Sequence, residues 1–260
     1  MTESTAHPPL EGRHAVITGG GSGIGAAIAA RLAQDGARIT LMGRNAARLE
    51  ATARDLDIAR AAAMDVTDET AVAHAFTRAV EGFGPVSILV NSAGAVQSMP
   101  FRKLDSAHWC AMLEVNLTGA FLCAKAVTEP MVQAGWGRIV SVASTAGLKG
   151  YPYVAAYCAA KHGLIGFTRA LAMEFAQKNI TVNAVCPGYT ETDIVAQSVE
   201  TLMTKTGRSR ARALNDLTAA NPQKRLVQPT EVAAAVAWLC APSSAAITGQ
   251  SIAVAGGEVM

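Results

Sequence analysis

Short strand-like runs alternate with helix-like segments along almost the whole 260-residue chain. The runs expected to form strands are residues 14–18, 38–42, 61–64, 87–90, 138–142, 181–185 and 251–254. Helices are expected from the first glycine-rich turn to about residue 36, and over 46–56, 69–83, 106–134, 154–177 and 230–240. Short apolar strands joined by helical crossovers predict a parallel sheet with helices on both faces.

One stretch, residues 193–228, breaks this alternation. It is long and polar, and it lies between the sixth expected strand and the last helix. Excursions of this kind at the carboxyl ends of parallel strands usually cover ligands. Half of the residues are hydrophobic and 16% are charged, which is enough apolar surface for one continuous core. We therefore expect a single domain over 1–260, with a flexible tail over 1–10 and a helical, substrate-covering lobe over 193–228.

Several classes of protein are disfavoured by composition. The net charge of +2 gives no reason to expect nucleic-acid binding. Five cysteines without a C-x-x-C pair are better interpreted as buried free thiols than as disulfides, and five histidines without ligand spacing predict no metal site. The N-terminus has no apolar leader, and we expect no run long and apolar enough to span a bilayer. These features predict a cytoplasmic protein with no membrane partner.

A glycine-rich turn, T-G-G-G-S-G-I-G, runs from Thr18 to Gly25 between the first strand and the first helix. Glycines allow a tight turn there and bring backbone N–H groups close to a pyrophosphate at the positive end of the helix. A glycine turn can also serve packing alone, but this position favours dinucleotide binding. The cofactor-binding candidates in the turn are Gly19, Ser22, Gly23, Ile24 and Gly25.

The spacing T-G-x-x-x-G-x-G resembles that of the short-chain dehydrogenase/reductase family, and later motifs agree. Asn91-Ser92-Ala93-Gly94 resembles the family's N-N-A-G, with Ser92 as its one departure. The resemblance extends from the first strand to Gly256-Gly257 and implies a Rossmann-type, doubly wound sheet of seven parallel strands. It also implies cofactor contacts from Asp65, Val66, Asn91, Ala93, Gly94, Pro187, Gly188, Thr190 and Thr192.

The nucleotide preference is inferred from the end of the second strand, Gly43-Arg44. Family members that prefer NAD usually carry an acid at the Gly43 position, where it bonds the ribose 2′-hydroxyl. Here the acid is missing, and the guanidinium of Arg44 suits the oxygens of a 2′-phosphate. The family's other basic determinant, at the Ser22 position, is absent. We therefore expect NADP(H), with NAD(H) as the alternative and a solvated Arg44 as the competing interpretation.

Ser144, Tyr157 and Lys161 have the order and spacing of the family's S…Y-x-x-x-K catalytic set. Tyrosine titrates near pH 10, so it needs tuning to act as an acid or base near neutrality. Lys161 lies four residues on, on the same helix face, where its charge should lower the pKa of Tyr157. Lys161 can also hold the nicotinamide ribose, and Ser144 can donate to the substrate oxygen. By resemblance, Asn116 is the fourth member, linking Lys161 to solvent through water. Without the other motifs, Tyr157 and Lys161 would more often be a surface pair.

The resemblance is strongest to bacterial 3-oxoacyl and polyketide ketoreductases and 3-hydroxyacyl-CoA dehydrogenases. It implies an NAD(P)(H)-dependent oxidoreductase acting on a ketone or secondary alcohol, with a CoA or carrier-protein thioester as the preferred substrate. Six basic residues against three acidic ones in 193–228 could steer such phosphates, although a solvated helix face is the alternative. The other functional hypotheses are a non-thioester ketone, cyclic alcohol or sugar alcohol as substrate, and a catalytically silent nucleotide sensor. A homotetramer is expected by resemblance.

Overall fold

The computed structural model describes residues 8–260, apart from the side chains of Thr201, Leu202 and Lys205. Within this range the chain forms one seven-stranded sheet in the order β3-β2-β1-β4-β5-β6-β7. The strands are β1 His14–Thr18, β2 Arg38–Gly43, β3 Ala59–Ala63, β4 Ile88–Asn91, β5 Gly137–Val142, β6 Ile180–Pro187 and β7 Ser251–Val254. All neighbours are parallel, so all carboxyl ends lie at one edge. The winding reverses between β1 and β4, and such a switch point is where open α/β sheets bind ligands.

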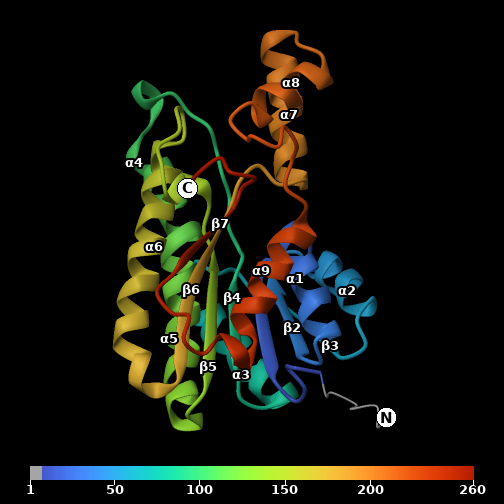
Figure 1. Cartoon of the computed structure of the whole chain (residues 1–260), viewed down its shortest axis with the longest axis vertical. Helices are drawn as coiled ribbons and strands as arrows, with labels where there is room; N and C mark the ends of the chain where they lie inside the picture. Colours follow the sequence, from blue (N-terminus) through green and yellow to red (C-terminus); the bar gives the residue numbers. More distant parts are fainter. Residues whose placement is uncertain (1–7) are drawn as a thin grey trace.

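Helices cover both faces of this sheet (Figure 1). The helices α1 Gly23–Gln34, α2 Ala46–Arg54 and α9 Pro229–Cys240 contribute to one apolar core. The other face is covered by α3 Glu69–Phe83, α5 Gly119–Ala134 and α6 Ala155–Phe175, with α4 Ser106–Leu113 beside α6. Successive residues of a strand point to opposite faces, so Ile17 joins the first core and Val16 the second. The expected doubly wound fold is confirmed.

The stretch after β6 is a separate helical lobe that projects beyond the carboxyl edge of the sheet, at the top of Figure 1. It consists of α7 Asp193–Thr206 and α8 Arg210–Thr218. Val195, Val199 and Ala213 form a small apolar core between the two helices. A parallel bridge between Thr190 and Val227 brings the start and the end of the lobe together. The expected helical lobe is therefore present, built as an excursion from the end of β6.

Three expectations need correction. The tail expected over 1–10 is too long, because Leu10 is fully buried in the core and its N–H donates to Asp35 O at 2.8 Å; residues 1–7 lie outside the described residues. The strand expected at 61–64 begins two residues earlier, at Ala59. The cysteines are all free, as expected, but Cys110 is exposed and Cys158 only half-buried, so not all of them are buried thiols.

The helical run 106–134 differs from expectation in two ways. By length and composition it could cross a membrane, contrary to our expectation that no run could. Its apolar side chains Leu122, Val127 and Met131 pack on the sheet, as in a core helix of a globular domain. The run is also not one regular helix, because residues Glu114–Thr118 form a π-helical turn between α4 and α5. Such turns are frequent at functional sites.

Candidate active site

The glycine-rich turn joins β1 to α1 at the switch point. Gly19 has a positive φ of 69°, and a Cβ on Gly25 would lie 2.2 Å from Gly19 O, so side chains are excluded where the turn folds against the helix. Ser22 is the N-cap of α1 but makes no side-chain cap hydrogen bond. The Ser22 side chain therefore accepts no hydrogen bond from the first N–H groups of α1. By contrast, the side chains of Asn45 and Asp68 accept such bonds at α2 and α3. This cradle fits a pyrophosphate.

The Asn91–Gly94 segment lies directly against the glycine-rich turn. Thr18 is paired with Asn91 across β1 and β4, and its Oγ1 accepts hydrogen bonds from the N–H groups of Ser92 and Ala93, both at 3.1 Å. A Cβ on Gly19 would lie 2.9 Å from Ala93 N. Asn91 Nδ2 donates to Ala120 O at 3.5 Å, while its Oδ1 is buried without a partner. The segment departs from the family motif at Ser92 without disturbing this packing.

The residues expected near the adenosine lie at the carboxyl ends of β2 and β3. Asp65 Oδ1 accepts from Thr67 N at 3.0 Å and from Thr67 Oγ1 at 2.9 Å. These bonds, with the nearby charge of Arg44 as a smaller cause, hold the pKa of Asp65 below its usual value. Val66 is buried, and Arg44 is exposed. An exposed guanidinium beside this loop is free to meet a 2′-phosphate.

The segment from Pro187 to Thr192 passes between the sheet and the lobe. Gly188 N donates to Val254 O at 3.1 Å, which joins it to the end of β7. Thr190 Oγ1 donates to Gly188 O at 3.0 Å, and Thr192 Oγ1 donates to Thr190 O at 3.2 Å. A Cβ on Gly23 would lie 3.1 Å from Thr192 Cγ2. The structure therefore brings this segment against the glycine-rich turn.

Asn116 is held in the π-helical turn by three hydrogen bonds. Its Oδ1 accepts from Ala95 N at 3.2 Å, and its Nδ2 donates to Ala95 O at 2.8 Å and to Met112 O at 3.0 Å. Gly94 lies between Asn116 and Lys161, since a Cβ there would be 2.8 Å from Asn116 Oδ1 and 3.6 Å from Lys161 Nζ. The structure brings Asn116 close to Lys161, but bonds Asn116 to the backbone of Ala95 rather than to the lysine.

Tyr157 and Lys161 lie on one face of α6, with Lys161 Nζ 5.6 Å from the centre of the Tyr157 ring. Lys161 is buried, and its Nζ donates to Val142 O at 2.9 Å. Burial lowers the pKa of Lys161 to about 8. Burial also raises the pKa of Tyr157 to about 12, which a hydrogen bond with Ser144 partly opposes. The expected lowering of the Tyr157 pKa by Lys161 is therefore wrong for the protein alone: the pKa lies above its usual value, burial is the largest cause, and Ser144 rather than Lys161 opposes it.

Ser144 completes the cluster at the end of β5. It is the N-cap of the short helix η3 Thr145–Gly147, and its Oγ accepts from Ala146 N at 3.1 Å. The hydroxyl thus has its proton free to donate in the direction of Tyr157. All four residues expected in the catalytic set come together at the carboxyl edge of the sheet, next to the glycine-rich turn.

Sequence reasoning missed three contributors to this edge. Thr18 was singled out only as the start of the turn, yet it anchors Ser92 and Ala93. Arg48 lies beside the turn, where a Cβ on Gly21 would be 3.2 Å from Arg48 Cβ, and its place in the first turn of α2, just after Arg44, could have indicated it. Glu258, near the C-terminus, has a side chain only 2% exposed, and nothing in its sequence context marks it.

Within residues 8–260, no three His, Cys, Asp or Glu side chains are placed to hold a metal ion.

Known proteins resemble this chain over nearly its whole length. The acetoacetyl-CoA reductase of Cupriavidus necator is 39% identical, over 94% of this chain and 97% of its own. The 3-oxoacyl-acyl-carrier-protein reductase of Vibrio cholerae is 37% identical, over 96% and 99%. A crystal structure of an actinorhodin polyketide ketoreductase variant with NADPH has a TM-score of 0.91 and 39% identity, over 95% and 97%.

The family profile described as short chain dehydrogenase matches residues 13–203, which include the glycine-rich turn and all four expected catalytic residues. The match covers more than half of the chain, and it agrees with the parallel sheet and the position of its switch point. The glycine cradle fits the nicotinamide dinucleotides that this family uses. The chain therefore belongs to the short chain dehydrogenase family, whose members are nicotinamide-dependent oxidoreductases of ketones and alcohols.

Proposed function

We propose that this chain reduces the ketone of a 3-oxoacyl thioester, carried on coenzyme A or a carrier protein, with NADPH as the hydride donor. The observation that carries the proposal is the convergence of Ser144, Tyr157, Lys161 and Asn116 between the glycine-rich turn and the lobe. A catalytically silent nucleotide sensor would not need this arrangement. Relatives named acetoacetyl-CoA reductase and 3-oxoacyl-acyl-carrier-protein reductase support the thioester over other ketones.

The residues divide the chemistry of carbonyl reduction among them. The reduced nicotinamide supplies a hydride to the carbonyl carbon, so the protein must supply a proton to the oxygen. Tyr157 is that acid: with a pKa raised to about 12 it stays protonated at neutral pH, as a proton donor must. Ser144 donates a hydrogen bond to the same oxygen as negative charge develops there. The substrate carbonyl therefore lies between the hydroxyls of Ser144 and Tyr157.

Lys161 and Asn116 support this pair. Lys161 has a pKa of about 8, so it is mostly protonated at neutral pH and presents an ammonium group to the nicotinamide ribose. The Val142 carbonyl fixes that ammonium group. Asn116 orients the Gly94–Ala95 backbone beside it and, as in the family, would connect Lys161 to solvent through water. Both residues act by position and charge, while Tyr157 transfers the proton.

The preference for NADP(H) over NAD(H) rests on Arg44 and, in addition, on Arg48. Both guanidinium groups are exposed near the start of α2, and Gly43 stands at the end of β2, where NAD-preferring family members usually carry an acid. Arg48 Nη1 lies 3.0 Å from Asp193 Oδ2. Because this ion pair is exposed, replacing Asp193 by a phosphate as the partner of Arg48 costs little free energy. NAD(H) remains the alternative cofactor.

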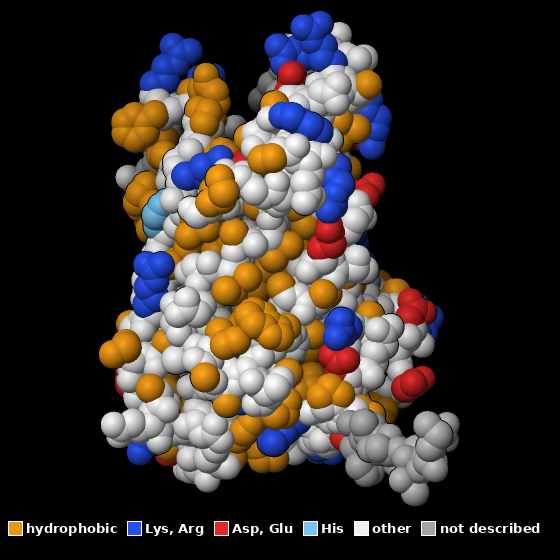
Figure 2. All heavy atoms as spheres, in the orientation of Figure 1, with side chains coloured by type: hydrophobic (Ala, Val, Ile, Leu, Met, Phe, Trp, Pro, Cys, Tyr) orange, Lys and Arg blue, Asp and Glu red, His pale blue; other side chains and the backbone are white. Residues whose placement is uncertain are grey.

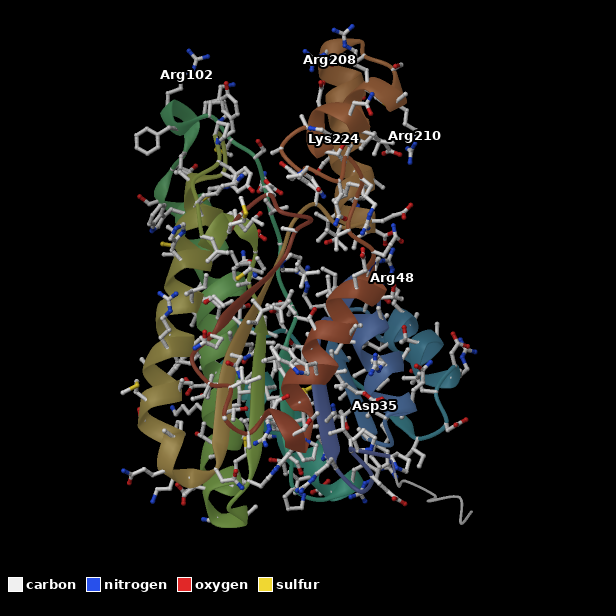
Figure 3. All side chains as sticks on the ribbon, viewed as in Figure 1. Asp35, Arg48, Arg102, Arg208, Arg210 and Lys224 are labelled. Carbon is white, nitrogen blue, oxygen red and sulfur yellow. The ribbon has the colours of Figure 1, made fainter. Side chains whose placement is uncertain are left out.

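The thioester assignment draws further support from charge around the opening of the site. Figure 2 shows a notch between two projections, each with basic side chains at its tip. Arg208, Arg210 and Lys224 lie on the lobe, and Arg102 lies on the opposite projection (Figure 3). Arg208 pairs with Asp216, an acid that the count for 193–228 already includes, whereas Arg225 pairs with Glu231 in α9, outside the lobe. Only the second pair makes the lobe less basic than its residue count suggests. Cations on both sides of the notch would attract the phosphates of coenzyme A or phosphopantetheine.

The substrate class is tested by ionic strength and by charge removal. With acetoacetyl-CoA, kcat/KM should fall steeply as salt rises, whereas a neutral 3-ketoester should respond weakly. Replacing Arg208, Arg210 and Arg212 together by alanine should reproduce that loss for the CoA substrate only. The matched control removes three exposed cations near the amino edge of the sheet, Arg54, Arg78 and Lys178, and should leave both substrates unaffected. Equal salt profiles, or no turnover of any acyl thioester, would reject the substrate while leaving the family assignment in place.

We also propose a cytoplasmic homotetramer. Large apolar side chains remain exposed on the outer helices α4, α5 and α6, including Trp109, Phe121 and Met173. These helices lie together on one side of the molecule in Figure 1, and a second copy would cover their exposed apolar side chains. Sedimentation at several protein concentrations tests the assembly.

A further inference from the structure

A buried carboxylate lies next to the candidate active site, outside the set described above. Glu258 follows β7, and only 2% of its side chain is exposed. Its Oε1 lies 3.1 Å from Lys149 Nζ and accepts a hydrogen bond from the Tyr151 hydroxyl. Lys149 and Tyr151 belong to the segment that joins η3 to α6. The C-terminal segment is thereby bonded to the segment that follows the catalytic serine.

The bond to Tyr151 continues towards Ser144. Tyr151 Oη lies 2.7 Å from Thr145 Oγ1. A hydroxyl has one proton, and Tyr151 gives its proton to the Glu258 carboxylate, so Thr145 is the donor to Tyr151. Burial and the bond to Glu258 raise the pKa of Tyr151, which keeps this proton in place. Thr145 directly follows Ser144, so a chain of bonds runs from Glu258 to the residue beside the catalytic hydroxyl.

The other oxygen of Glu258 faces the opposite wall of the site. A Cβ on Gly188 would lie 3.1 Å from Glu258 Oε2. Burial raises the pKa of the neighbouring Tyr189, and the charge of Glu258 raises it further. Glu258 therefore stands between the Ser144 segment and the Pro187–Gly188 segment, and these are the two segments that the substrate carbonyl and the nicotinamide must approach together.

The residues before Glu258 fix its position against the end of the lobe. Gly256 and Gly257 have positive φ angles of 60° and 89°. A Cβ on Gly256 would lie 2.3 Å from Asn221 Oδ1, and one on Gly257 would lie 3.3 Å from Pro222 Cγ. Side chains are excluded at both positions, so the chain passes tightly under the lobe before it reaches Glu258. Two segments of the site thus meet at the Glu258 carboxylate, and the end of the lobe lies against the two glycines before it.

We propose that Glu258 is a positioning residue for carbonyl reduction, which acts through Tyr151 and Thr145 to hold the Ser144 segment at a fixed distance from the Gly188 segment. The proposal rests on the proposed function, since it assigns Ser144 to the substrate oxygen. Glu258 contacts neither reactant. Glu258 acts on the alignment of the Ser144 hydroxyl. Misalignment of this hydroxyl should lower kcat more than it weakens cofactor binding.

Kinetics of a double-mutant cycle test the proposal. Glu258→Ala and Tyr151→Phe should each lower kcat roughly tenfold, with the affinity for NADPH unchanged within a few-fold. The double variant should be no slower than Glu258→Ala, because both changes break the same chain of bonds. Glu258→Gln, which can still accept from Tyr151, should keep more activity than Glu258→Ala. Unchanged kcat in both single variants, or fully additive losses, would overturn the proposal.

A second measurement needs no substrate. Hydrogen exchange of residues 144–153 should become roughly tenfold faster in Glu258→Ala, because the segment loses its tie to the C-terminal strand. Glu69→Ala is the matched control, since it also removes a carboxylate from a lysine at 3.1 Å, but the Glu69–Lys125 pair is exposed and joins α3 to α5 rather than the C-terminal segment to residues 144–153. Unchanged exchange in Glu258→Ala would overturn the proposal. If the wild type reduces some ketone but no 3-oxoacyl thioester, the substrate assignment fails. The double-mutant cycle is then measured with that ketone.

Discussion

Arg48 at the start of α2 and Asp193 at the start of α7 form an ion pair, with Nη1 3.0 Å from Oδ2. The pair joins the helix beside the glycine-rich turn to the first helix of the lobe. Both side chains are more than half exposed, so the pair contributes at most about 1 kcal/mol to stability. A phosphate bound between Arg44 and Arg48 would compete with Asp193 for Arg48. Cofactor binding would then weaken the ion pair that holds the start of α7.

Replacing Arg44 with alanine should weaken NADP(H) binding far more than NAD(H) binding. Loss of one charge-assisted contact to a phosphate is worth about 1.5–3 kcal/mol, or roughly ten- to hundred-fold in Kd. Fluorescence titration with both cofactors measures the effect, with Arg54→Ala, at the far end of α2, as the control for charge alone. Equal losses for both cofactors would make Arg44 a solvated surface residue, and a wild-type preference for NAD would reverse the cofactor assignment.

Tyr157→Phe should abolish turnover and leave NADP(H) affinity within a few-fold of the wild type. Only the hydroxyl that transfers the proton is lost, while the ring remains. Lys161→Ala should impair both turnover and cofactor binding, since Lys161 lies nearest the ribose in our proposal. Steady-state kinetics and cofactor titration separate the two patterns. Substantial activity in Tyr157→Phe would show that another group supplies the proton.

The buried Lys161 should make stability rise with pH in a defined window. Its pKa is about 8 in the folded protein, whereas an exposed lysine has a pKa of 10.5, so between these values the unfolded chain holds the proton and the folded one does not. The free energy of unfolding should then rise by up to about 1.4 kcal/mol per pH unit. Tyr157, with its pKa raised from 10.0 to about 12, acts in the opposite direction above pH 10.

Urea unfolding from pH 8 to pH 10 measures this contribution. Lys161→Met removes the titrating group and keeps a buried chain of similar length, and all other groups titrate alike in both proteins. The difference in unfolding free energy, wild type minus variant, should increase with pH across the window. A flat difference would mean that Lys161 keeps its ordinary pKa despite its burial.

The inner strands of the sheet were predictable because they are buried on both faces. β1, which is buried throughout, was expected with the bounds that the structure has, and so was β7, an edge strand that is only partly buried. β3, A-R-A-A-A, was misplaced by two residues, and most of its side chains are exposed. Its apolar content is too low to mark where it begins, and pairing with β2 decides the boundary instead.

The catalytic set, including the distant Ser144 and Asn116, was predicted from the family's motifs, whereas residues outside those motifs were missed. Helical spacing alone would have left Tyr157 and Lys161 as a surface pair, and the π-helical turn that holds Asn116 leaves no mark in the apolar periodicity. The raised pKa of Tyr157 follows from burial, which sequence spacing does not report. Glu258 follows two glycines near the C-terminus and looks like a solvated residue until Lys149 and Tyr151 are placed beside it.

The corrected N-terminal boundary can be tested by a core substitution. Leu10 is fully buried with residues of α1 and β1, so Leu10→Ala should lower the free energy of unfolding by about 2–5 kcal/mol. Pro9→Ala, one residue earlier and exposed, is the matched control and should change little. Chemical denaturation measures both. A small effect of Leu10→Ala would restore the longer tail.

The bridge between Thr190 and Val227 has a consequence for how such enzymes diversify. Because the two ends of the lobe are held side by side, its length can change while the separation of its ends stays fixed, provided that contacts such as those of Asp193 and Asn221 with the rest of the domain are kept. The entropy of closing a longer or shorter excursion changes slowly with its length. Lineages can therefore exchange or resize the lobe, and with it the range of molecules admitted, while the scaffold that performs the hydride chemistry is inherited intact.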